Sequence, residues 1–130
     1  MENIICSELK GIVDMKKPDF INLGYIHQED TVYFEIYVKS GEEVFSMPED
    51  VEIELVTVNK RKLDAPIIKQ KEGIYVDVSL GKIYGFLLPE AIEHSGCIYG
   101  QLEIKAKGKV KTPIFHFEIG RTIEGFANWD

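Results

Sequence analysis

Every second residue between positions 32 and 38 is a large apolar one, and this alternation constrains the fold more than any other feature. The apolar residues are Val32, Phe34, Ile36 and Val38. A period of two places them on one face of a β-strand and turns the other face to solvent. Shorter sets of the same kind recur within 51–55, 74–78, 98–104 and 115–119. The chain is therefore predicted to be a series of half-buried strands.

Turn sequences that contain Gly, Pro, Asp or Ser separate these sets, for example at 40–41, 48–50 and 95–96. The run 82–88 is more uniformly apolar and predicts a central strand. Only the segment near 89–95 favours a helix, because Pro89 suits a first helical position and Gly96 follows the last one. We predict an all-β fold, an antiparallel sandwich of about seven to eight strands with one short helical turn near residues 89–95.

The last hairpin can be predicted down to its register. If Gly108-Lys109 is a two-residue loop with Gly first, as a type II′ turn prefers, Leu102 faces Phe115 and Ile98 faces Ile119. In this register Cys97 faces Gly120. A slip by one residue would pair inward positions with outward ones, so the alternation supports the pairing.

The two ends of the chain differ from the middle. Residues 1–18 contain a Lys16-Lys17-Pro18 break and predict an N-terminal arm or an edge segment, whereas residues 19–120 form the predicted sandwich. Residues 121–130 are a C-terminal aromatic tail with Phe126 and Trp129. Because Trp and Phe are enriched in interface cores, we expect this tail to dock, either on its own sheet or on a neighbouring copy.

Composition excludes several classes of protein. The 130 residues are 45% apolar and 28% charged, as expected for one soluble domain. A net charge of −7 argues against nucleic-acid binding through general electrostatics. No apolar run approaches the roughly 20 residues of a membrane span. The N-terminal ten residues lack the pattern of a signal peptide, and we expect synthesis in a cytosol with Cys6 and Cys97 reduced.

No motif for catalysis or cofactor binding stands out. His94 and Cys97 lie three residues apart at a turn, but a zinc site needs further ligands at recognisable spacings. Cys97 also lacks the base and the orienting carboxylate that activate a nucleophile. Glycine-rich phosphate loops are absent from the sequence. We therefore expect a protein that is not an enzyme and that needs no metal and no cofactor.

Two groups of surface residues are candidates for binding. The basic loop of Lys60, Arg61 and Lys62 is a charged hairpin loop, a weak anion site, or a docking patch that suits head-to-tail self-association of an acidic chain. The outward-facing tyrosines Tyr33, Tyr37 and Tyr99 form a protein interface, a cross-strand aromatic ladder or a platform for sugar rings. The interface and the ladder are favoured over the platform.

The order of short motifs along residues 20–119 is also informative. Gln28-Glu29-Asp30 precedes the long strand, and the segment from Gly81 ends in Leu88-Pro89. A basic hairpin at 107–111 then leads to the closing run Phe115-His116-Phe117-Glu118-Ile119. In this order the chain resembles the N-terminal domain of phage baseplate upper proteins.

This resemblance implies an immunoglobulin-like β-sandwich that serves as a structural part of a phage tail tip and has no catalytic residues. We expect a non-enzymatic component of a phage or prophage tail baseplate, located in the virion tail. Its expected partners are further copies of itself and other baseplate or tail proteins, with Phe126, Trp129 and the basic loop as contacts. The alternative is a carbohydrate-binding module for cell-wall or surface glycans that uses the three tyrosines.

Overall fold

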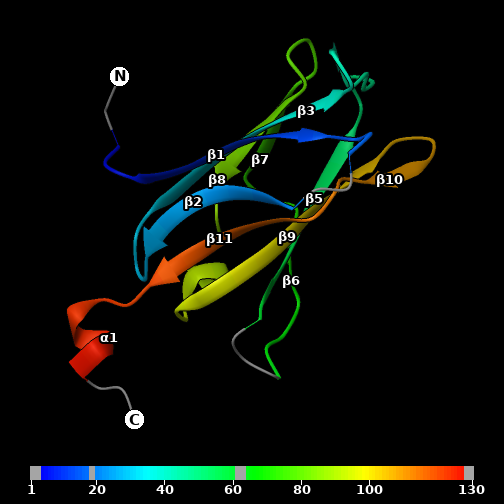
Figure 1. Ribbon diagram of the computed structural model, residues 1–130. Helices are drawn as coiled ribbons and strands as arrows, with labels where there is room; N and C mark the ends of the chain where they lie inside the picture. Colours follow the sequence, from blue (N-terminus) through cyan, green and yellow to red (C-terminus); the bar gives the residue numbers. More distant parts are fainter. Residues whose placement is uncertain (1–3, 18–19, 61–63, 128–130) are drawn as a thin grey trace.

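Two β-sheets pack face to face in a computed structural model of the chain, which describes residues 4–17, 20–60 and 64–127 (Figure 1). The first sheet contains β1 (Ser7–Asp14), β3 (Val32–Ser40), β8 (Lys82–Phe86) and β7 (Ile74–Asp77) in that order, with β4 (Glu43–Val44) paired to β3. The second contains β2 (Ile21–His27), β11 (Phe115–Gly120), β9 (Gly96–Lys105), β5 (Glu52–Asn59) and β6 (Ile68–Gln70), with β10 (Lys109–Lys111) paired to β9.

The predicted fold class is confirmed: the chain is an all-β sandwich of two sheets with one short 3-10 turn, η1 (Pro89–Ile92). The described residues form more strands than expected, because β4, β6 and β10 are pieces of two or three residues. A short helix, α1 (Ile123–Ala127), follows the last strand. Two pairings are parallel rather than antiparallel, namely β1 with β3 and β2 with β11.

The strands β1 and β2 follow each other in the chain but belong to different sheets. Each lies at the end of its sheet and is paired on one side, so the chain crosses from sheet to sheet at the turn between them. β1 falls within the segment 1–18, and its residues Leu9 and Val13 are fully buried. This segment therefore contributes both an edge strand and part of the core.

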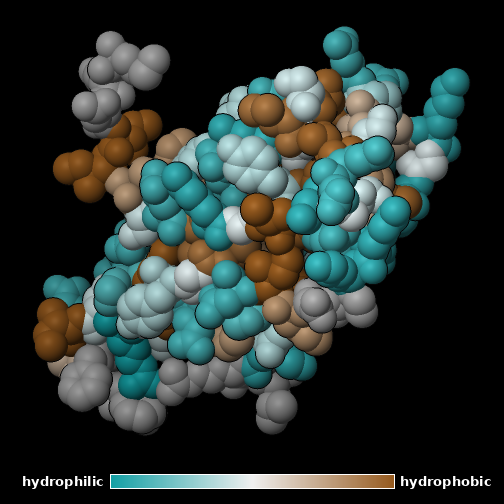
Figure 2. All heavy atoms as spheres, turned by 45° about the horizontal axis from the view of Figure 1, so that its top comes forward, coloured by the Kyte–Doolittle hydropathy of each residue, from teal (hydrophilic) through white to brown (hydrophobic). Residues whose placement is uncertain are grey.

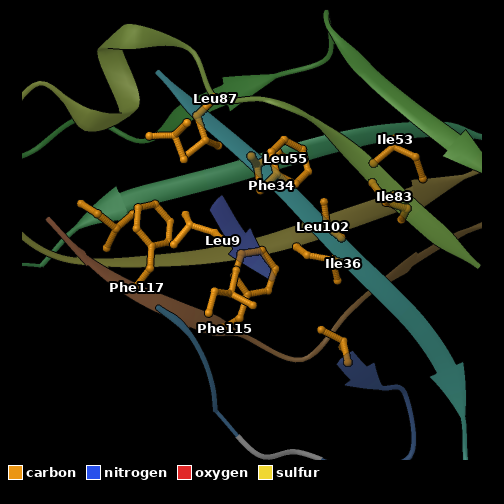
Figure 3. Close-up of a cluster of buried hydrophobic side chains, with 14 of the residues drawn as sticks. Leu9, Phe34, Ile36, Ile53, Leu55, Ile83, Leu87, Leu102, Phe115 and Phe117 are labelled. Atoms are coloured by element: carbon orange, nitrogen blue, oxygen red, sulfur yellow. The ribbon is translucent and has the colours of Figure 1, made fainter. Parts of the chain in front are cut away.

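The core fills the space between the sheets with inward-facing side chains from both (Figure 3). All four apolar residues of the 32–38 alternation are buried, as the period of two predicts. Phe34 enters from the first sheet, and Phe115 and Phe117 enter from the second. Because both sheets share this core, the opposite face of each strand remains outside. The candidate site lies on one of these outer faces.

The predicted register of the last hairpin is wrong by two residues. Phe115 pairs with Gly100 and Phe117 with Ile98, and Cys97 faces Glu118. The loop is longer than expected, since Lys109 pairs with Lys105 and the Ala106 amide donates to the Gly108 carbonyl. A shift of two residues keeps every side chain on its face, so alternation alone cannot detect it.

The buried carboxylate of Asp14 ties the turn after β1 to the turn after β3. Its Oδ1 atom accepts hydrogen bonds from the backbone amides of Gly41 and Lys16, both at 3.0 Å. These two bonds, the one from Gly41 first, hold the pKa of Asp14 below its ordinary value of 3.8.

We expect Asp14 to make stability sensitive to acid. A carboxyl whose pKa is lower in the folded state stabilises that state above its ordinary pKa, and this contribution is lost as the pH falls through the lowered value. Asp14→Asn should therefore unfold at a lower temperature than the wild type at pH 7. The difference should shrink towards pH 3, which thermal melts followed by circular dichroism would measure. A difference that stays constant over this range would contradict the assignment.

Candidate functional site

The outer face of the first sheet carries a cluster of aromatic side chains that we call the tyrosine face. It comprises Tyr33, Tyr37, Tyr75, Tyr84 and Phe86, with Ile12 at its border. Phe86, Tyr75 and Ile12 are 39–59% exposed, and the other three are half-buried. An exposed face so rich in large rings is typical of a binding surface.

Strand register brings these side chains together from four strands. Tyr33 pairs with Phe86 across β3 and β8, and Tyr75 pairs with Tyr84 across β7 and β8. Ile12 of β1 lies opposite Tyr37 of β3. Residues paired in this way share one side of the sheet, because successive side chains of a strand point to opposite faces.

The rings pack against one another edge-on or tilted. The ring centroids of Tyr33 and Phe86 are 5.6 Å apart with 63° between their planes. Those of Tyr75 and Tyr84 are 5.8 Å apart with 32° between the planes. Such contacts are the usual favourable ones for aromatic pairs, so the face is preorganised by its own side chains.

A half-buried ion pair lies between the rings. The Nζ atom of Lys82 is 3.1 Å from Oε1 of Glu35, and the Tyr33 hydroxyl donates a hydrogen bond of 3.0 Å to the same oxygen. The Lys82 ammonium also lies 4.9 Å from the centroid of the Tyr84 ring. Opposite charges are thus neutralised within the face.

The pKa values of these groups reflect this arrangement. Burial acts to raise the pKa of Glu35, but the hydrogen bonds from Lys82 and Tyr33 outweigh it and the net shift is downwards. The bond to Glu35 raises the pKa of Lys82. Burial, followed by the hydrogen bond to Glu35, raises the pKa of the Tyr33 hydroxyl. At neutral pH the face therefore presents a protonated tyrosine and a closed ion pair.

The structure separates the three tyrosines that the sequence grouped together. Tyr33 and Tyr37 lie on the tyrosine face, whereas Tyr99 belongs to β9 on the outside of the other sheet. There its ring makes an edge contact with Phe20 at 5.9 Å and a tilted one with His116 at 6.0 Å. A single platform of all three is ruled out, since the whole core lies between the two outer faces.

Three members of the tyrosine face were missed by the sequence reasoning. Tyr84 and Phe86 lie in the run 82–88, which reads as uniformly apolar. In the structure it alternates, with Ile83 buried and Tyr84 and Phe86 on the outside. Tyr75 lies between Ile74 and Val76, whose inward alternation already placed it outside. The period of two would have placed all three on the outer face if it had been applied to aromatic residues as strictly as to charged ones.

Other residues singled out from the sequence lie elsewhere. Lys60 is exposed at the end of β5, while Arg61, Lys62 and Trp129 lie outside the described residues. Phe126 belongs to α1, but the described part of the structure does not include its side chain. Both Cys6 and Cys97 are half-buried free thiols.

Apolar side chains also reach the surface away from the tyrosine face. Figure 2 shows brown apolar atoms between teal hydrophilic ones, and Ile4, Ile5 and Phe20 are all more than 60% exposed. In the described segments, no group of His, Cys, Asp and Glu side chains is placed to hold a metal ion. No helix in these segments is long and apolar enough to cross a membrane.

Comparisons with known proteins bear on the fold alone. No protein-family model matches the chain, and no curated protein matches its sequence. Among solved structures, extracellular domains 3–5 of Drosophila OTK are similar, with 9% sequence identity and a TM-score of 0.34. The match covers 91% of this chain and 38% of the other.

Proposed function

We propose that this chain is a non-enzymatic assembly module that binds other proteins through its tyrosine face. The observation that carries the proposal is the composition of this face: five aromatic rings lie around the Glu35–Lys82 ion pair, and an exposed ion pair of Glu8 and Lys10 lies on β1 at its edge. Interface cores are enriched in aromatic residues and depleted of uncompensated charge. Contact with a partner would bury these large rings, which is the main favourable contribution that such a surface offers.

The order of motifs along residues 20–119 supports a more specific proposal. In this order of motifs the chain resembles the N-terminal domain of phage baseplate upper proteins. Its partners would then be other proteins of a phage or prophage tail baseplate, and it would be located in the virion tail. A rigid sandwich with an aromatic face suits this role, because a structural part binds through preformed surfaces.

A second candidate is the binding of cell-wall or surface glycans at the same place. Exposed tyrosines support it, since Tyr75 is 59% exposed. Ring geometry favours the protein partner instead. A sugar ring stacks flat on an aromatic face, whereas the two ring pairs here are inclined by 32° and 63° to each other.

We expect Tyr75→Glu combined with Phe86→Glu to weaken binding of a baseplate partner by at least about tenfold, because interface anchors of this type contribute most of the affinity. The partners to test are the tail proteins encoded beside this chain's gene, mixed in purified form and analysed by size-exclusion chromatography with light scattering. Tyr25→Glu is the matched control, since Tyr25 is 58% exposed on the other sheet.

Equal binding by the double variant and the control would contradict the role of the tyrosine face. Titration with purified cell-wall polysaccharide tests the second candidate. If the wild type bound the polysaccharide and the double variant did not, and if no tail protein formed a complex, the partner of the tyrosine face would be a glycan and not a protein.

A further inference from the structure

A preformed groove of about 730 Å³ lies at the end of the sandwich that carries η1 and α1. Its lining comes from the loop between β2 and β3, from η1, and from the start of the C-terminal segment. The buried core residues Val32, Leu87 and Ile92 lie beneath it, and the exposed Pro89 is its accessible apolar residue. The groove therefore has an apolar floor and one exposed apolar residue at the end of the sandwich whose helix α1 is at the lower left of Figure 1.

The rim of this groove is acidic. Glu29, Glu90, Glu93 and Glu124 line it, and all four are exposed. Within the described part of the chain, none of these carboxylates forms an ion pair. Four like charges that form no ion pair favour a cationic occupant.

Hydrogen bonds hold the walls of the groove in place. Gln28 donates from Nε2 to the Glu93 carbonyl at 3.0 Å, and its Oε1 accepts from the Thr122 amide at 3.4 Å. Asp30 accepts from the Ser7 hydroxyl at 2.6 Å and from the His27 amide at 3.0 Å. An occupant meets a formed site, which keeps the entropic cost of binding low.

The opposite end of the sandwich has the complementary surface. A hollow of about 430 Å³ is lined there by Lys16, Lys17 and Lys111 together with Phe20 and Ile114. The three lysines are exposed and form no ion pair with described residues, and Phe20 is 62% exposed. Figure 1 shows β10 at the right, at this end, and hydrophilic side chains crowd the right of Figure 2. We call it the lysine end.

Lys60, the described residue of the basic loop, does not lie at the lysine end. It follows Asn59, the last residue of β5, which donates to the carbonyls of His94 and Ser95 beside η1, both at 3.2 Å. Lys60 therefore lies at the same end of the molecule as the acidic groove. Head-to-tail contact needs a cationic surface at the other end, and the lysine end is placed there.

We propose that copies of this chain associate head to tail, with the lysine end of one copy seated in the acidic groove of the next. Lysines would meet the four rim glutamates, and Phe20 and Ile114 would cover the apolar lining. Such a contact joins two different surfaces, so repetition produces a closed ring or an open filament. The proposal rests on the assembly function and names a second copy as one partner, at sites separate from the tyrosine face.

Charge reversal with rescue tests this contact. The groove variant combines Glu90→Lys with Glu93→Lys, the lysine-end variant combines Lys16→Glu with Lys17→Glu, and the control combines Glu49→Lys with Asp50→Lys in an exposed turn. Mass in solution would be followed by light scattering over a concentration series, at about 0.05 M and about 0.5 M salt.

The wild type and the control should grow in mass with concentration, and less so at high salt. Each single-end variant should remain at the chain mass of 14.8 kDa. A chain with both reversals should associate again, a result that damage to folding could not produce. Failure of this rescue, or unchanged association of the single-end variants, would overturn the proposal.

Failure of this contact and failure of the assembly function are distinguishable. A wild type that stays at 14.8 kDa at every concentration overturns the head-to-tail contact, while complexes with other tail proteins would still support the tyrosine face. Self-association that is lost only with Tyr75→Glu and Phe86→Glu would also overturn it and would assign the self-contact to the tyrosine face.

Discussion

Replacing Phe117 by alanine is expected to lower the free energy of unfolding by about 3–5 kcal/mol. Phe117 is 1% exposed and lies on β11, between β2 and β9 in the second sheet. Its ring points into the cluster that also holds Phe115 and Leu9 (Figure 3). Truncation removes the transfer free energy of the ring and leaves a cavity that the two flanking strands prevent from closing.

Urea unfolding followed by circular dichroism would measure this loss. Glu118→Ala is the matched control on the same strand, because Glu118 is exposed and its replacement should change stability by no more than about 0.5 kcal/mol. A domain of this size has a total stability of about 5–15 kcal/mol, so the Phe117 variant would lose a large part of it. A loss below about 1 kcal/mol would show that the ring does not lie in a rigid core.

The second large effect is expected at Gln70, a polar side chain buried between the two sheets. From β6 its Nε2 atom donates to the carbonyls of Phe86 at 2.8 Å and Glu72 at 3.0 Å, and its Oε1 atom accepts from the Leu88 amide at 3.1 Å. Gln70→Leu keeps the volume and removes all three bonds. Each backbone group left without its hydrogen-bond partner should lower the free energy of unfolding by about 1–3 kcal/mol where water cannot replace the side chain.

Two measurements separate this effect from ordinary packing. Lys69→Leu, an exposed neighbour on β6, should leave urea stability nearly unchanged. Hydrogen exchange should show the Leu88 amide losing protection in the Gln70 variant ahead of amides in β9. An unchanged exchange rate at Leu88 would mean that the side chain does not tie the sheets together there.

The sequence predicted the local geometry of the strands well and their long-range pairing less well. The alternation from Val32 to Val38 placed each side chain on the correct face, because that property depends only on the period of two. Neighbouring strands cannot be identified in this way. Tyr84 and Tyr75 join Tyr33 only because β8 lies between β3 and β7, an arrangement set by the packing of the whole sheet.

The edge strand β1 illustrates a second limit. Leu9 and Val13 are inward-facing, but Gly11 stands between them and interrupts the apolar signal. β1 also pairs in parallel with β3, so no tight turn marks its partner in the sequence. The last hairpin shows a third limit, because an extra loop residue and an irregularity near Thr112 shift the register without moving any side chain to the other face.

The acidic groove could not be predicted from spacing at all. Its glutamates come from three separate segments: the β2–β3 loop, η1 with the residue that follows it, and α1. The basic loop stood out because its charges are consecutive in the chain. The lysine end combines Lys16 and Lys17 with Lys111, which are far apart in sequence and come together only at the shared end of β1 and β11.

The loop between β2 and β3 has a mechanical consequence for the molecule. The Ser7 amide, where the chain enters the first sheet, donates to the Thr31 carbonyl, and the Gln28 amide donates to the Gly120 carbonyl, where the chain leaves the last strand. Glu29 between them adopts a left-handed conformation, with φ of 67°. One short turn is therefore hydrogen-bonded both to the start of β1 and to the end of β11, so it links the first strand of the sandwich to its last.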